Sequence, residues 1–305
     1  MSKNSLLKTV FGSDYADYFK FDRGSNKKIN KAFGLNGNDS FYVGGRNQFN
    51  IRLFGGEGSD SFQSDSNVSD FNTVKGAFQR SAVRIYGEGG NDSIIDLFGG
   101  SYILSGGDGD DRIKYHTNTG TYYGYTKPKL IIDGGQGNDR ISYFNFPNAK
   151  GIIRGGEGDD LIGIGGKSGG GGITYLGDGG DDVFYLKMMT NERDTIINGG
   201  AGYDELYISN DLYKRLIRFE ESSGTTRMIF NYWQKDGIAY ESSITLIDIE
   251  HIGTARDFIP YKLGGYVNQS GGEIQSLYGS NQPYTPGPNS GIGAVTEYWS
   301  NNSGF

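Results

Sequence analysis

Gly106-Gly107-Asp108-Gly109-Asp110-Asp111-Arg112-Ile113-Lys114 is one copy of a nine-residue pattern that recurs along the chain. The pattern has glycine at positions one and four, aspartate at position six and a large apolar residue at position eight. Eight copies match in full, and their sixth-position aspartates are Asp39, Asp60, Asp92, Asp111, Asp139, Asp160, Asp182 and Asp204. Glycine stays in phase with aspartate and with apolar residues, which argues against a flexible low-complexity segment.

The residue types in each copy point to a turn that binds a metal through oxygen. Glycine at two fixed positions permits a tight turn with positive φ and lets the backbone approach a ligand. Carbonyl and carboxylate oxygens, without sulfur or imidazole, suit calcium and disfavour zinc or copper. One turn supplies only part of a shell of about six to eight oxygens, so a second stacked turn must complete it.

The predicted ligand set takes one aspartate from each copy and glycines from the turns. It consists of several Ca²⁺ ions held by Asp39, Asp60, Asp92, Asp111, Asp139, Asp160, Asp182 and Asp204, with Gly55, Gly106, Gly134, Gly155, Gly177 and Gly199. If metal is absent, carboxylates stacked at the strand spacing of about 4.8 Å repel one another. The metal-free chain is therefore expected to fold poorly.

Two apolar segments in each coil predict two strands. One follows the aspartate, as in Ser40–Val43, and its residue two after the aspartate is expected to face the core. The other precedes the next glycines, as in Ile51–Phe54 and Val83–Tyr86. Coils of this kind predict an all-β protein, a parallel β-roll or β-helix solenoid with a C-terminal β cap.

The nonapeptide resembles the RTX (haemolysin-type) calcium-binding repeat, and the resemblance extends from about Gly12 to Asp257. It implies a secreted protein that folds on binding calcium and leaves the cell through a type I exporter reading a C-terminal signal. Residues 1–10 lack an apolar core long enough for an N-terminal secretory signal, which agrees with that route. Consecutive aspartates here are 19 to 32 residues apart, as in Asp92–Asp111 and Asp60–Asp92. Tandem nonapeptides would place them closer, so one calcium turn per coil, on one edge, is expected.

Changes in pattern suggest four segments. Residues 1–33 form an N-terminal cap with a degenerate first repeat around Asp17, and residues 34–209 form the solenoid. Residues 210–260 form a C-terminal cap, in which Ile249-Glu250-His251-Ile252 resembles the segment that closes RTX arrays. Residues 261–305 are a Gly/Asn/Tyr-rich tail, either docked or an export signal.

Composition narrows the function classes. The chain has no cysteine, so it needs no disulfide and has no thiol chemistry. Its net charge of −7 disfavours a general nucleic-acid role. No apolar run approaches the roughly 20 residues of a membrane-spanning helix.

The favoured function is a secreted calcium-binding module with a structural or extracellular interaction role, whose partner is a polysaccharide or a cell surface. An adhesin is a related alternative. A different class is a carbohydrate-active enzyme, a uronate polymer lyase or epimerase. Its candidate residues are Lys114, His116, Tyr122, Tyr123, Tyr125 and Arg140. There a Tyr or His would abstract a proton next to a carboxylate that Arg or Lys neutralises. No spacing motif requires catalysis, so the enzyme is the less favoured hypothesis.

Overall fold

The fold is given by a computed structural model. It describes residues 8–21, 29–43, 51–64, 82–97, 101–116, 129–144, 150–165, 172–187, 195–235, 238–254, 261–262, 265–266 and 275–276. The chain divides into two compact units, Met1–Asp139 and Arg140–Phe305, and each is described by itself. Residues 65–81 and 117–128, which lengthen two of the coils, and most of the C-terminal tail lie outside the described residues.

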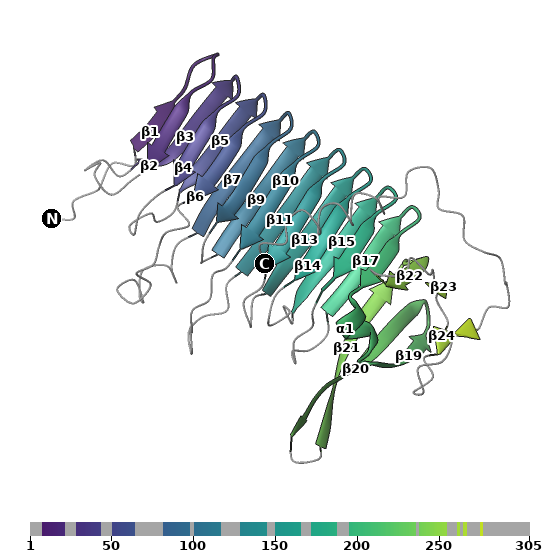
Figure 1. The fold of residues 1–305 in the computed structure, drawn as a ribbon. Helices are drawn as coiled ribbons and strands as arrows, with labels where there is room; N and C mark the ends of the chain where they lie inside the picture. Colours follow the sequence, from purple (N-terminus) through teal and green to yellow (C-terminus); the bar gives the residue numbers. More distant parts are fainter. Residues whose placement is uncertain are drawn as a thin grey trace. The chain divides into compact units, whose positions relative to one another are not determined.

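The first unit consists of two parallel sheets, and successive strands of the chain alternate between them (Figure 1). One sheet contains β1 (Lys8–Phe11), β3 (Ile29–Asn36), β5 (Arg52–Glu57), β7 (Ala82–Gly89), β9 (Ser101–Asp108) and β11 (Lys129–Gln136). The other contains β2 (Tyr18–Phe21), β4 (Ser40–Val43), β6 (Ser61–Ser64), β8 (Ser93–Leu97) and β10 (Arg112–His116). Each coil contributes one strand to each sheet, so the prediction of a parallel β-solenoid is confirmed.

The core of the first unit lies between the two sheets and is built in columns. On one side the position-eight residues are buried in register, with Phe41 1% exposed and Phe62 0% exposed. Their rings stack 4.6 Å apart. The facing sheet buries Ala32, Leu53, Ile85, Leu104 and Ile132, all 0% exposed. Because side chains alternate along a strand, the residues between these point outward.

The second unit repeats the same arrangement. One sheet contains β13 (Lys150–Glu157), β15 (Ile173–Gly179), β17 (Thr195–Ala201), β21 (Ile238–Ile247), β20 (Thr225–Lys235) and β19 (Leu216–Ser222), in that order. The other contains β12 (Arg140–Phe144), β14 (Leu161–Gly165), β16 (Val183–Leu186), β18 (Glu205–Ile208), β22 (His251–Thr254) and β23 (Tyr261–Lys262). The short strands β24 (Gly265–Tyr266) and β25 (Gln275–Ser276) pair with each other.

The repeats end in an antiparallel meander. Helix α1 (Asn210–Tyr213) follows β18, and the side chain of Ser209 caps its N-terminus. Strand β21 pairs parallel with β17, while β20 and β19 pair antiparallel beyond it, so the last coil's open edge is covered. The apolar segments at residues 227–233 and 244–247 lie within β20 and β21.

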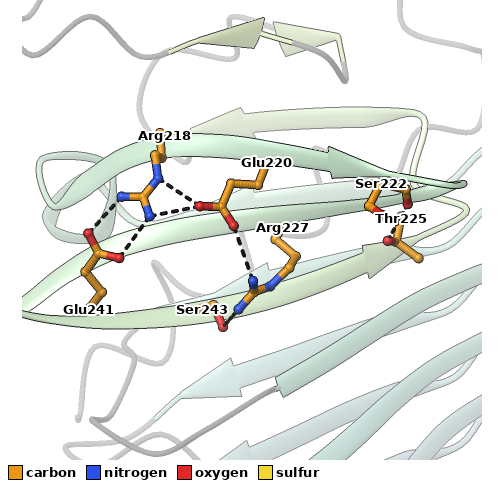
Figure 2. A network of polar contacts seen from close by, with 7 residues as sticks. All are labelled: Arg218, Glu220, Ser222, Thr225, Arg227, Glu241 and Ser243. Carbon is orange, nitrogen blue, oxygen red and sulfur yellow. Dashed lines mark hydrogen bonds and ion pairs between the residues drawn. The ribbon is translucent and has the colours of Figure 1, made fainter.

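The meander carries a charged network on its surface (Figure 2). Arg218 makes ion pairs of 2.8 Å with both Glu220 and Glu241, and Arg227 donates to Glu220 at 3.2 Å and to Ser243 at 2.9 Å. The charged side chains are 39–48% exposed, so each pair contributes at most about 1 kcal/mol. The network balances its own charges and stabilises the meander only weakly.

Replacing a core ring of the first unit tests the columnar packing. Phe62→Ala removes a fully buried ring that stacks on Phe41. The change is expected to lower the free energy of unfolding by about 3–5 kcal/mol, measured by urea denaturation. Gln63→Ala, at the exposed next position of the same strand, is the control and should change it by less than about 0.5 kcal/mol. Equal effects would contradict the assigned faces of β6.

Candidate metal centre

The sixth-position aspartates form a hydrogen-bonded ladder within each unit. In the first unit Oδ1 of Asp39 accepts the backbone N–H of Asp17 at 2.7 Å. The same 2.7 Å contact joins Asp39 to Asp60, Asp60 to Asp92, Asp92 to Asp111 and Asp111 to Asp139. In the second unit the backbone N–H of Asp160 donates to Oδ1 of Asp182, and that of Asp182 donates to Oδ1 of Asp204, both at 2.9 Å. The aspartates of each unit therefore lie in one file, each fixed by the amide of the preceding coil.

The other carboxylate oxygen of the ladder is buried without a donor. The eight aspartates are 0–2% exposed. Within the described residues no hydrogen-bond donor reaches Oδ2 of Asp39, Asp60, Asp92, Asp111, Asp182 or Asp204. A buried charged oxygen without a partner is costly, so these atoms require either a cation or a proton.

Glycine at position one is required by space rather than by backbone conformation. A Cβ atom on Gly34 would overlap Oδ2 of Asp39 and the carbonyl oxygen of Gly55 in the next turn. Its φ is not in the left-handed region, so the prediction of positive φ at this position is wrong. Position four does have positive φ, as at Gly58 with 128°. Position two has it as well, and there it is adopted even by Leu35 at 83°.

The same overlap shows that carbonyl oxygens gather beside the unpaired carboxylate oxygens. Among the predicted glycines, the carbonyl oxygens of Gly55, Gly106, Gly134 and Gly199 lie beside the aspartate Oδ2 of the preceding turn. For Gly155 and Gly177 it is the α-carbon that lies against Oδ2 of the same turn. The carbonyl oxygens of Gly87 and Asp248 occupy equivalent places and were not predicted.

The donor set fits a hard cation that takes most of its ligands from the backbone. Among the described residues, no three His, Cys, Asp or Glu side chains come together as a metal site. Six of the turns instead offer an aspartate carboxylate oxygen with a carbonyl oxygen beside it. Such an all-oxygen set is the one that calcium prefers.

A second, exposed ladder shows by contrast what position six requires. The side chains of Asn38, Asn91, Asp110, Asp159 and Asp181, at position five, accept the amide of the next coil's fifth residue at 2.8–3.0 Å. Asparagine and aspartate are interchangeable there because only an acceptor is needed. Position six contains aspartate in all eight copies. An acceptor alone does not explain that uniformity, whereas a negative charge does.

The two ends of the ladder are closed by residues outside the pattern. At the first coil, Oδ2 of Asp17 accepts the backbone N–H of Ser13 at 2.6 Å and its hydroxyl at 2.9 Å, so it is satisfied without a cation. At the last coil, Glu250 Oε2 accepts the amide of Asp204 at 2.7 Å. Both segments were predicted to act as caps, but neither of these contacts was predicted. The serine directly after Gly12 was the available signal for the first, while 46 residues separate Asp204 from Glu250.

Burial raises the pKa of the ladder carboxyls. Desolvation raises the pKa of Asp92 to about 8 and that of Asp182 to about 9. In both, the backbone hydrogen bond from the preceding aspartate lowers the pKa in part, and neighbouring carboxylates raise it again. The same causes raise the pKa of Asp204 to about 7 and those of Asp60 and Asp111 to about 6. Without a cation, the raised pKa values of Asp92 and Asp182 therefore oppose ionisation of these two carboxyls at neutral pH.

The residues of the predicted catalytic cluster are spread over both units and the part of the chain outside the described residues. Lys114 is half-buried in β10 of the first unit, and Arg140 is exposed in β12 of the second. His116 ends β10, and its side chain is not described. Tyr122, Tyr123 and Tyr125 lie outside the described residues.

Comparison with known proteins adds no family assignment. No protein-family model and no curated protein matches the chain. The described residues also contain no helix that is both long enough and apolar enough to cross a membrane.

Two glycines of one turn test the space beside the carboxylate. Gly177→Ala would place a methyl group against Asp182 Oδ2 and the Gly199 carbonyl, whereas Gly179→Ala meets only the flexible end of Glu157, at 3.0 Å. We expect the first to lower the free energy of unfolding by about 2 kcal/mol or more, by urea denaturation. The second should cost under about 1 kcal/mol. If both variants behave alike, the close approach at position one is wrong.

The raised pKa values predict how the stability of the metal-free protein, kept in EGTA, depends on pH. The folded chain holds ladder protons to pH values of about 6 to 9, whereas the unfolded chain releases them near the ordinary value of 3.8. The folded state thus binds more protons, and stability falls as the pH rises from about 4 to 9. Urea midpoints in EGTA should be lower at about pH 8 than at about pH 5, and added Ca²⁺ should remove most of the difference. A metal-free protein that gains stability over this range would contradict the assignment.

Proposed function

We propose that this chain is a calcium-binding β-solenoid of the RTX type, in which Ca²⁺ binds between stacked turns and stabilises the folded state. The observation that carries the proposal is the file of buried aspartate Oδ2 atoms, six of which lie beside a carbonyl oxygen of the next coil. Bound cations would neutralise the negative charge of these buried oxygens. Within one turn, Asp111 Oδ2 and the Gly134 carbonyl oxygen are the ligands we infer.

The chain's own groups prepare the sites before any ion arrives. The amide of each preceding aspartate fixes Oδ1, so the carboxylate cannot rotate freely and Oδ2 stays directed at the turn. Glycine at position one keeps the space beside that oxygen open. The absence of a side chain there and the orientation of the carboxylate both lower the cost of ordering the ligands on binding.

Calcium is favoured over magnesium by the character of these ligands. Magnesium requires near-ideal octahedral geometry and retains several waters, so it rarely uses a cage made of protein oxygens alone. Calcium accepts six to eight oxygens in irregular arrangements, including backbone carbonyls. Buried turns that present carbonyl and carboxylate oxygens match the second description.

The biological role we propose is that of a secreted structural or interaction module. Extracellular calcium modules bind the ion at about 10⁻⁴–10⁻³ M, so such a chain would remain metal-poor inside a cell and fold outside it. The repeat's resemblance to exported RTX proteins supports export through a type I exporter. Circular dichroism of the purified chain in EGTA and in millimolar Ca²⁺ tests the first step, because strand signal and thermal midpoint should both rise with calcium.

Variants of two adjacent aspartates, Asp110 and Asp111, distinguish the effect of the buried negative charge from the effect of the hydrogen bond. Asp111→Asn replaces a ladder carboxylate by an amide, which is expected to weaken calcium-dependent stabilisation while leaving the chelated protein as stable as the parent or more so. Asp110→Asn is the control, since the exposed side chain keeps its acceptor for the Asn138 amide, 2.8 Å away. The measurement is the shift in unfolding free energy between EGTA and Ca²⁺, about 2.7 kcal/mol for a site at a hundredfold excess over its Kd.

Two outcomes would contradict the proposal. One is a parent protein with the same stability in EGTA and in Ca²⁺. The other is an Asp111→Asn variant whose calcium shift equals that of the parent, with Asp110→Asn unchanged. Either outcome would mean that the ladder carboxyls are protonated and are held by hydrogen bonds without a bound metal.

A further inference from the structure

Strands β1, β3, β5 and β7 are neighbours in one parallel sheet (Figure 1). Their outward residues form two parallel files of side chains. The aromatic file consists of Phe11, Phe33, Phe54 and Tyr86, and the cation file consists of Lys31, Arg52 and Arg84. Ala32, Leu53 and Ile85, which alternate with them, are 0% exposed in the core. The two files together are called the cation–aromatic face below.

The aromatic file presents ring edges to solvent. Its rings stack at centroid distances of 5.1, 4.7 and 5.0 Å with interplanar angles of 5°, 17° and 15°. The rings within the file therefore cover one another's faces. At its two ends, the outer faces of Phe11, which is 63% exposed, and of Tyr86, which pairs in register with Ser105, meet no further ring of the file. The edge of an aromatic ring carries partial positive charge, so this file favours an anionic neighbour.

The cation file places like charges directly opposite one another. Lys31 pairs in register with Arg52, and Arg52 with Arg84. Lys31 Nζ lies over the rings of Phe33 and Phe54, at 4.3 and 5.1 Å from their centroids. In the part of the chain that the structure describes, no carboxylate forms an ion pair with these three residues. Nε of Arg84 is buried without an acceptor. Like charges in register destabilise a sheet, so an external anion would relieve a cost that the fold otherwise bears.

We propose that the cation–aromatic face binds an acidic polysaccharide, lying across strands β3, β5 and β7. Successive cations are one strand apart, about 4.8 Å, which suits a polymer carrying repeated carboxylate or sulfate groups. A single-stranded nucleic acid is disfavoured because its bases need free ring faces on which to stack, and these rings cover one another. The proposal names a partner for the interaction module proposed above and rests on that function for its extracellular setting.

Removing the cation file should abolish most of the binding. The probe is chondroitin sulfate, with neutral dextran as the uncharged comparison, and the protein is the full chain in Ca²⁺. We expect Lys31→Gln/Arg52→Gln/Arg84→Gln to lower the affinity by about tenfold or more. The same variant should unfold at an equal or higher temperature than the parent when no glycan is present, because the like-charge column is gone.

Two further variants serve as controls. Arg112→Gln/Lys129→Gln/Lys150→Gln removes three exposed cations outside the face and should retain the parent affinity. Arg52→Lys/Arg84→Lys keeps the charge of the file and should retain affinity within about threefold. Binding should weaken as salt concentration rises in the parent and much less in the triple glutamine variant.

The proposal is overturned if the parent does not bind chondroitin sulfate, or if the two triple variants bind it equally well. Equal or tighter binding of single-stranded DNA through the same cations would replace the polysaccharide with a nucleic acid. Circular dichroism in EGTA and Ca²⁺, run on the same samples, reports the calcium proposal separately. A loss of glycan binding without a change in that signal therefore affects this face alone.

Discussion

A buried carboxylate between stacked turns constrains the rest of this structure. Its Oδ1 must meet the amide of the preceding coil, and its Oδ2 must lie against a backbone without a side chain. These two contacts hold every turn at one spacing. Asp60 and Asp92 are 32 residues apart and Asp92 and Asp111 are 19 apart, yet both ladder contacts are 2.7 Å. Differences in coil length are therefore absorbed elsewhere in the coil, and the turn edge stays regular.

The ladder also has a direction, which makes its two ends chemically unlike. Each aspartate amide donates toward the C-terminal neighbour, so the last coil needs an acceptor and the first needs donors. Glu250 supplies the acceptor with a longer side chain, and the amide and hydroxyl of Ser13 donate to Oδ2 of Asp17 in the first coil. A cap in this fold therefore does more than cover apolar surface. It must complete a file of polar contacts that would otherwise stop at an unpaired group.

The repeat made the fold and the alignment of Asp60, Asp92 and Asp111 predictable, because a fixed phase of glycine, aspartate and apolar residue leaves one way to stack coils. The roles of the individual glycines were harder to assign. Whether position one is glycine for its φ or for the space it leaves depends on where a neighbouring coil's carbonyl lies, and composition does not report that. Leu35 at positive φ shows the converse, since the turn imposes a conformation that the residue itself disfavours. The segment containing Glu250 was singled out as the closing segment, but its contact with the Asp204 amide was not predicted, because the meander separates the two residues in sequence but not in space.

Net charge proved a poor guide to the surface, for a reason that the ladder explains. The formal charge of the chain is −7, and the eight ladder aspartates contribute −8 of it, so the remaining residues carry +1. The net negative charge of the chain is thus accounted for by the carboxylates of the buried turns, which lie beside backbone oxygens and favour a cation. Cations such as Arg52 lie outward on the strands without carboxylate partners among the described residues. An argument from overall acidity against anionic partners therefore counts charges that a partner would never meet, and the local charge of each face is the quantity that decides what it can bind.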